Sequence, residues 1–373
     1  MGKCLLATPN YIKSRFYPTV MGGGNWSVSG PLDNLKGKFF INAAISETAM
    51  ASDTQMHVHF GAERDVKVVA IQNSDITKAA GRMVVRASNA PAWTGRTVTG
   101  AHLVGASTLY VNDTTGIMAG EVLTIAGDST VYDITTVSGP TTLEIRNTTD
   151  KTGLLHTTAG DEAITCHSGK YGGVEEVYNS GIRDYYGVVY PPGILTWGSP
   201  GLWDGKETDE NLFELDLPRP FVHILPNPVT AAYWHIAVTD EANPNGGVTL
   251  DALHITAGYS PIYNMEYGAV QGLTSNTTKE ESAGGAEIFG EEASGRYVDF
   301  MLKNGTVNDA FVNIFDLQRR LDIHDDLFFI YDVDDTALMT RRAFVGRLED
   351  LSELGHAAFD SVDAHFRIKE KLA

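Results

Sequence analysis

The sequence predicts a mainly β protein, in which a β-sandwich is interrupted by a small inserted β-barrel and is followed by an α+β domain. Short alternating apolar segments between polar turns fill residues 26–96 and 168–260, which is typical of an antiparallel sandwich. Residues 97–167 are rich in Thr, Gly, Ser and Val and have no helical period, whereas residues 261–373 contain an amphipathic helix. Insertion at a loop tip of a stable scaffold is tolerated because few contacts cross the junction.

Composition bounds the size and the partners of the protein. The 373 residues predict two or three domains, and a hydrophobic content of 43% is enough for packed cores. The net charge of −19, densest in residues 261–373 with 21 Asp and Glu against 11 Lys and Arg, disfavours nucleic acid as a partner. Cys4 and Cys166 are expected to be free thiols in a reducing compartment. The sequence has no secretory signal and no run of about 18 apolar residues, which predicts synthesis in a cytoplasm without membrane insertion.

The elements of the sandwich are predicted in chain order. Residues 1–25 are expected to be an arm without regular structure, because Pro9, Pro18 and three consecutive glycines interrupt it. The core is predicted to include Leu32, Leu35, Phe39 and Phe40. Alternation predicts strands at residues 56–60, 66–71 (after a turn), 82–87, 212–217, 233–238 and 253–255.

The insert and the C-terminal domain have different patterns. Five short strands of the insert can close a barrel that hides their edges, at residues 108–111, 121–125, 131–135, 143–145 and 163–165. A helix is predicted over residues 306–323, with Thr306 and Asp309 at its N-terminal cap. Its periodic apolar residues are Val307, Ala310, Phe311, Ile314, Phe315, Leu317 and Leu321. Strands are predicted at residues 327–331, 342–348 and 365–368.

The motifs of common enzymes are missing from the sequence, so we expect no catalytic residues, no cofactor and no metal. There is no Gly-x-Ser-x-Gly elbow, no phosphate loop and no His-Glu-x-x-His. His57 and His59 would face one side of a strand, but a third ligand cannot be placed, and Cys166-His167 is equally weak. Residues 332–335 (Asp-Val-Asp-Asp) resemble part of a cation loop, but without its Gly and distal Glu a solvated turn is favoured over weak Ca²⁺ binding.

A loop rich in aromatic residues is the candidate binding site. Tyr190, Trp197, Trp203 and Asp204 can form a glycan-binding surface, because aromatic faces beside polar groups suit sugars. The same aromatic side chains, with Tyr185 and Tyr186, can instead pin a long loop or fill a subunit interface. We favour the anchoring interpretation and keep glycan binding as the alternative.

Several segments resemble known phage proteins. Residues 26–35, 60–66 and 233–236 (Tyr-Trp-His-Ile) resemble the galactose-binding-like, discoidin-type jelly roll. The whole arrangement resembles a distal tail structural protein of tailed bacteriophages, and residues 315–320, 328–335 and 341–348 resemble the same group. The insert segments 107–111 and 120–128 resemble a small β domain that recurs in phage virion proteins. The resemblance implies a virion component of the tail tip or baseplate that assembles as a ring or hub, as a trimer or hexamer, with other tail proteins and with host cell-surface polysaccharide as partners.

Three functions therefore compete. The first is a structural protein of the phage tail tip, located in the virion tail. The alternative is a carbohydrate-binding adhesion module without an assembly role, suggested by the aromatic loop. A glycan-degrading enzyme rests on fold analogy alone, which is a weak basis for assigning function.

Overall fold

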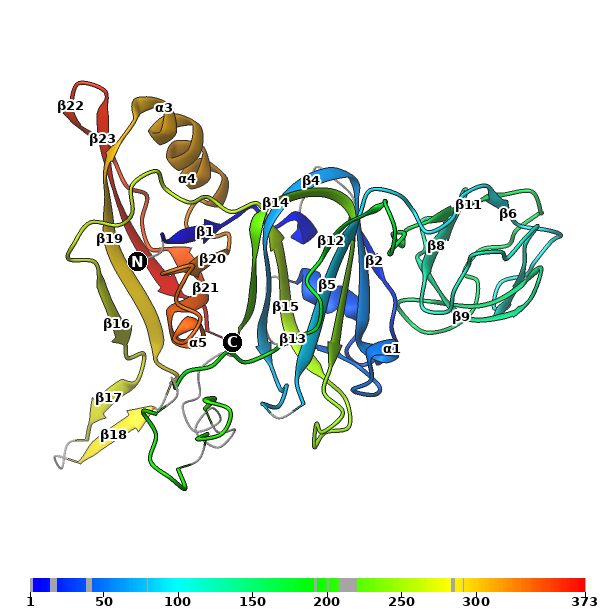
Figure 1. Ribbon diagram of the computed structural model, residues 1–373, viewed down its shortest axis with the longest axis horizontal. Helices are drawn as coiled ribbons and strands as arrows, with labels where there is room; N and C mark the ends of the chain where they lie inside the picture. Colours follow the sequence, from blue (N-terminus) through cyan, green and yellow to red (C-terminus); the bar gives the residue numbers. More distant parts are fainter. Residues whose placement is uncertain are drawn as a thin grey trace. The chain divides into compact units, whose positions relative to one another are not determined.

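The protein consists of antiparallel β-sheets with few helices (Figure 1). The computed structural model describes residues 3–13, 19–37, 42–78, 80–190, 193–199, 201–207, 220–282, 286–290 and 292–372. The chain divides into two compact units, Asn10–Ala257 and Met1–Pro9 with Gly258–Ala373. We call them the sandwich unit and the C-terminal unit. The prediction of a mainly β fold is confirmed.

The sheet of the sandwich unit is built around two long strands, β4 and β14. Its order is β12-β5-β14-β4-β15-β3, with β13 paired to β5 and β2 paired to β4. The strands are β2 (Val20–Gly22), β3 (Ala44–Ile45), β4 (Gln55–Ser74), β5 (Arg82–Ser88), β12 (Glu176–Asn179), β13 (Arg183–Asp184), β14 (Phe221–Thr239) and β15 (Thr249–Thr256). Short helical turns accompany them: η1 (Tyr11–Lys13), η2 (Leu32–Lys36) and α1 (Ala51–Thr54).

Strands β4 and β14 form a ribbon that folds over the core. Its first half lies beside β2 and β5, and its second half lies beside β15. Register shifts between Ile224 and Val229, and between Ala231 and Tyr233, let the ribbon bend. The predicted strands 56–60 and 66–71 therefore belong to one strand, and the turn predicted between them is an irregularity within β4, where Gly61 has a φ of 70°.

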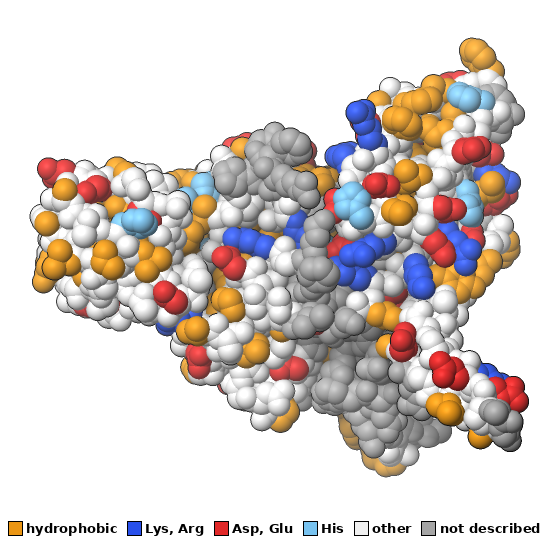
Figure 2. Space-filling model, turned by 180° about the vertical axis from the view of Figure 1, so that it is seen from behind, with side chains coloured by type: hydrophobic (Ala, Val, Ile, Leu, Met, Phe, Trp, Pro, Cys, Tyr) orange, Lys and Arg blue, Asp and Glu red, His pale blue; other side chains and the backbone are white. Residues whose placement is uncertain are grey.

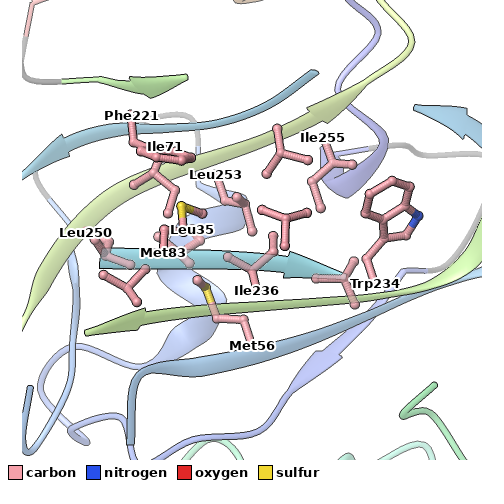
Figure 3. Close-up of a cluster of buried hydrophobic side chains, with 14 of the residues drawn as sticks. Leu35, Met56, Ile71, Met83, Phe221, Trp234, Ile236, Leu250, Leu253 and Ile255 are labelled. Carbon is pink, nitrogen blue, oxygen red and sulfur yellow. The ribbon is translucent and has the colours of Figure 1, made fainter. Parts of the chain in front are cut away.

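Apolar side chains from both halves of the ribbon meet in one core (Figure 3). Alternation along β4 and β14 points Met56, Trp234 and Ile236 inward, where they are fully buried. Leu32 and Leu35 of η2 are also buried there, as predicted. The predicted core residues Phe39 and Phe40 and the predicted strand 212–217 lie outside the described residues.

The N-terminal segment differs from the predicted irregular arm. Strand β1 (Leu5–Ala7) pairs with β20 of the C-terminal unit, and β2 pairs with β4 of the sandwich unit. Pro9 lies after β1, Gly22 is the last residue of β2, and Gly23 and Gly24 follow it, so these residues do not exclude either strand. Leu5 and Leu6 are buried, so the apolar run near the N-terminus completes a sheet whose remaining strands come from the other end of the chain.

The insert forms its own sheet, in the order β6-β11-β8-β9-β10-β7. Its strands are β6 (Arg96–Thr97), β7 (Thr108–Tyr110), β8 (Val122–Ile125), β9 (Tyr132–Gly139), β10 (Thr142–Asn147) and β11 (Ala163–Cys166). An antiparallel bridge between Val98 and Val111 joins the two ends of this order, and the closed sheet surrounds a separate apolar core. Closure of this kind removes exposed strand edges.

Buried polar contacts fix the insert to the sandwich. The Asp133 carboxylate is buried and accepts a hydrogen bond of 2.6 Å from the Gly23 backbone N–H. Arg146 donates to the Asn25 side chain at 2.7 Å and to the Gly24 carbonyl at 2.6 Å. Residues 23–25, which follow β2, therefore form the contact with the insert.

The C-terminal unit is a sheet in the order β1-β20-β21-β23-β19-β16, with β22 paired to β23. Its strands after β1 are β16 (Val270–Thr274), β19 (Gly295–Gly305), β20 (Leu327–Ile330), β21 (Ala343–Leu348), β22 (Leu354–Ala358) and β23 (Ser361–Glu370). A hairpin of β17 (Thr278–Glu281) and β18 (Glu287–Gly290) extends from β16 and β19 (Figure 1). The strands predicted over residues 327–331, 342–348 and 365–368 are confirmed.

The predicted helix is present as α3 (Val307–Asp309), η3 (Ala310–Phe315) and α4 (Asp316–Leu321), and a short α5 (Met339–Arg342) follows. Thr306 caps it as predicted, because its hydroxyl accepts from the Asp309 backbone N–H at 3.2 Å. Ile314, Leu317 and Leu321 pack on the sheet, but Phe311 and Phe315 are 45% and 46% exposed, so the prediction of one apolar face was wrong for these two. Among the described residues no helix has the length and apolar character needed to cross a membrane.

Candidate functional site

The aromatic loop predicted as a binding site follows β13 and is closed at its base by backbone hydrogen bonds. The N–H groups of Val189 and Tyr190 both donate to the Gly205 carbonyl at 2.8 Å, and the Gly205 N–H donates to Gly201 at 2.8 Å. Gly205 has a φ of 66°, and a Cβ atom there would lie 2.6 Å from the Tyr190 carbonyl oxygen. Only glycine fits this crossing of the two chain segments.

Two tryptophans of this loop form an exposed aromatic pair. The ring centroids of Trp197 and Trp203 lie 5.3 Å apart with their planes at 76°, an edge-to-face arrangement. Each side chain is 84% exposed. Val188 and Ile194 of the same loop are exposed as well. Exposed tryptophan rings in an apolar surrounding are uncommon unless they meet a ligand or a partner.

The other two predicted residues lie at the base of the loop. Tyr190 is half-buried, whereas Asp204 is exposed and accepts a hydrogen bond of 3.0 Å from the Lys206 backbone N–H. The Lys78 ammonium lies 3.3 Å from the second oxygen of Asp204. Burial alone would raise the pKa of Asp204, but the Lys206 hydrogen bond and the Lys78 charge outweigh it and lower that pKa. Asp204 is therefore an ionised hydrogen-bond acceptor beside the loop.

Ion pairs also hold the base of the loop. The Lys206 ammonium donates to Asp184 on β13 at 2.8 Å, and Arg82 on β5 lies 3.0 Å from the other oxygen of Asp184. Lys206 is buried, which makes this contact less accessible to solvent than an ordinary surface pair. The loop is thus attached to the sandwich by charges, while its tryptophans remain free to contact a ligand.

The two interpretations of the aromatic residues apply to different side chains. Tyr185 and Tyr186 are buried, and the Tyr186 hydroxyl donates to the Ile76 carbonyl at 3.1 Å, so these two anchor the loop. Trp197 and Trp203 have the exposure expected of a contact surface. The sequence did not distinguish these roles, because both pairs have the same aromatic character and neither shows a strand or helix period.

A buried histidine cluster lies where the insert meets the sandwich. His57 and His59 face one side of β4, as predicted, and their cross-strand partners on β14 are His235 and Tyr233. The ring nitrogens Nδ1 of His59 and His167 are 2.9 Å apart, and the Tyr233 ring stacks on His59 with centroids 4.2 Å apart. The cluster brings together His59 and His167, which belong to separate motifs of the sequence.

Burial keeps the clustered histidines neutral. It lowers the pKa of His167 and of His235 to about 4, helped by neighbouring His59 and by Arg86 respectively. It also lowers the pKa of His59 and, together with nearby His235, places that of His57 well below its ordinary value. Among the described residues, no group of three or more His, Cys, Asp or Glu side chains is arranged to hold a metal ion.

The acidic turn at residues 332–335 uses its carboxylates within the turn. Asp332 accepts from the Asp334 backbone N–H at 3.0 Å. Asp335 accepts from the Leu338 backbone N–H at 3.1 Å, and its second oxygen pairs with Arg342 at 2.7 Å. The turn differs from the predicted solvated turn in one respect, because Asp332 is buried whereas Asp334 is exposed.

The aromatic loop and the histidine cluster are thus two unusual side-chain arrangements in the described part of the sandwich unit, one exposed and one largely buried. Comparison of the chain with protein-family models, with curated proteins and with solved structures found no match.

Proposed function

We propose that the protein is a structural component of a bacteriophage tail tip or baseplate, located in the virion, where copies assemble into a ring or hub with other tail proteins. The resemblance of the chain as a whole, and of segments within residues 315–348 in particular, to distal tail proteins supports the proposal. The observation that carries it is the exposed apolar surface of the C-terminal unit. Groups of exposed apolar side chains are typical of protein interfaces, and this unit has one such group on the β17–β18 hairpin and another on the helix.

The exposed apolar residues of the C-terminal unit occupy several elements. Leu273, Ile288 and Phe289 are exposed on the β16 strand and the β17–β18 hairpin, and Phe311 and Phe315 are exposed on the helix. Tyr267 and Phe359 are fully exposed on connecting turns. Burying such surface against identical copies would remove it from water at a gain of about 25 cal/mol per Å².

The mass of the purified protein in solution tests the proposal. Light scattering behind a sizing column should show a closed oligomer of a small number of 40.4 kDa chains. Its mass should remain constant over a wide concentration range, because a closed ring leaves no free interface. A monomer at every concentration, also after chemical cross-linking, would contradict self-assembly.

Glycan binding by the aromatic loop is a second candidate function, favoured by the exposed Trp197–Trp203 pair. The apolar face of a sugar ring can stack on either tryptophan. The ionised Asp204 can then accept hydrogen bonds from sugar hydroxyls. Contact with host polysaccharide would be compatible with assembly, because the loop belongs to the sandwich unit and the exposed apolar elements belong to the other unit.

Trp203→Ala should abolish binding to any host polysaccharide that the wild type retains on a glycan array. The folding stability should change by less than about 0.5 kcal/mol, because the side chain is 84% exposed. Tyr267→Ala is the matched control, since Tyr267 is an exposed aromatic residue outside the loop. Equal binding by both variants and the wild type would exclude this loop as the glycan site.

A further inference from the structure

The hairpin β17–β18 is a projecting arm of the C-terminal unit. It continues the β16–β19 pair, so that two antiparallel strands extend beyond the rest of the sheet (Figure 1). The β17 and β18 residues are all exposed. A two-stranded hairpin without a packed face is marginally stable in water, so an arm of this kind gains most from a partner.

The surface of the arm is acidic and apolar. Ile288 and Phe289 are 58% and 52% exposed. Lys279 pairs with Glu287 and lies over the Phe289 ring, 5.9 Å from its centroid, so the positive charge of the arm is neutralised. Glu280 and Glu281 form no ion pair among the described residues. In Figure 2 the arm projects at the lower right and carries red and orange side chains.

The helix presents a basic and apolar stripe. Phe311, Phe315 and Arg319 are spaced by four residues and are all exposed, and the two Phe ring centroids are 5.9 Å apart. The segment η3 is a π-helix, and Phe311 and Phe315 lie beside the stripe of Ile314 and Leu317 that enters the core. Within the described residues, neither Arg319 nor Arg320 is engaged in an ion pair. π-Helical turns frequently occur at functional sites.

The arm and the helix stripe lie at opposite ends of β19. The arm precedes Gly295, the first residue of the strand, and the helix follows Gly305, the last. Eleven residues of extended chain span roughly 36 Å. The arm therefore cannot reach the helix stripe of its own chain without breaking β19, which is paired to β23 from Tyr297 to Gly305.

We propose that the arm of one copy docks on the helix stripe of a second copy. Ile288 and Phe289 would pack against Phe311 and Phe315. The carboxylates of Glu280 and Glu281 would face the guanidinium groups of Arg319 and Arg320, of which the Arg320 Nε donates to the Asp316 carbonyl at 3.1 Å. Because the arm and the helix stripe are different surfaces, each copy would contact the next one head-to-tail. The copies form a closed ring when the rotations between neighbours add up to one full turn. This inference rests on the proposed self-assembly and assigns its interface.

Charge reversal tests the proposed contact. Two double variants should each weaken self-association about tenfold or more, because like charges would then face each other. One is Glu280→Arg with Glu281→Arg, and the other is Arg319→Glu with Arg320→Glu. Mixing the two double variants should restore association between them, since each then supplies the surface that the other lacks. Glu175→Arg with Glu241→Arg is the control for the Glu280 and Glu281 variant, because it makes the same charge change outside both surfaces.

Disulfide trapping gives an independent test. A copy carrying Ile288→Cys and a copy carrying Phe315→Cys should form a cross-linked dimer when mixed under mild oxidation. The native Cys4 and Cys166 are buried, and burial raises the pKa of each thiol to about 12, so they should not react. If the wild type is oligomeric but the Cys variants form no cross-link and the charge-reversal variants associate normally, the arm contact is overturned and self-assembly is not. A wild type that stays monomeric would overturn both.

Discussion

Replacing Glu370 by Gln is expected to lower the free energy of unfolding of the C-terminal unit by about 3–5 kcal/mol. Glu370 on β23 is buried and accepts from the Arg296 backbone N–H at 2.8 Å and from its Nε at 2.9 Å. The Arg296 guanidinium also donates to the Thr340 carbonyl at 2.9 Å and lies 5.2 Å from the Phe344 ring centroid. Removing the carboxylate charge would leave a buried guanidinium without compensation.

The distribution of tryptophan makes this effect measurable. All five Trp residues lie between residues 26 and 234, so Trp fluorescence follows the sandwich unit alone. In urea titrations of Glu370→Gln, the transition seen by far-UV circular dichroism should include an early phase that Trp fluorescence does not show.

Glu349→Gln is the matched control for Glu370→Gln. It removes the carboxylate that pairs with Arg367 at 2.8 Å on the protein surface, and Arg367 lies on β23, as Glu370 does. The free energy of unfolding should fall by less than about 1 kcal/mol. If the two variants have equal effects, the buried pair is not a main support of this unit.

The amino-acid sequence predicted elements well where a local period determines them. The helix over residues 306–323 follows from its apolar spacing and its Thr306 cap, and β20, β21 and β23 follow from short apolar runs. The prediction was wrong at Phe311 and Phe315, which lie one residue further round the helix than the buried stripe of Ala310, Ile314, Leu317 and Leu321. An apolar residue at the edge of such a stripe can be buried or exposed, and the sequence pattern does not decide between the two.

Features that depend on distant contacts were not predictable. Strand β1 finds its partner more than 300 residues later, so its sequence alone gives no reason to exclude a flexible arm. The pairing of His59 with His167 spans 108 positions and requires the insert to dock. In the aromatic loop, the sequence identified the residues but not which side chains are buried, because only the folded loop separates Tyr186 from Trp203.

The histidine cluster leads to the second large prediction, a loss of stability in mild acid. The clustered histidines have lowered pKa values in the folded state, so the unfolded chain binds more protons between pH 6.5 and about 4. The free energy of unfolding should therefore fall as pH falls through this window. Each of His167 and His235 should contribute roughly 1.4 kcal/mol per pH unit.

The variant His235→Phe should separate this contribution from those of the carboxylates. Burial raises the pKa of Glu121 and of Asp133, which acts in the opposite direction, so the total slope does not isolate the histidines. Urea titrations followed by Trp fluorescence should show that the variant gains about 2 kcal/mol relative to the wild type between pH 7 and pH 5. His156→Asn, at a position with a 62% exposed side chain, should follow the wild type. Parallel curves for His235→Phe and the wild type would show that the cluster does not couple protonation to folding.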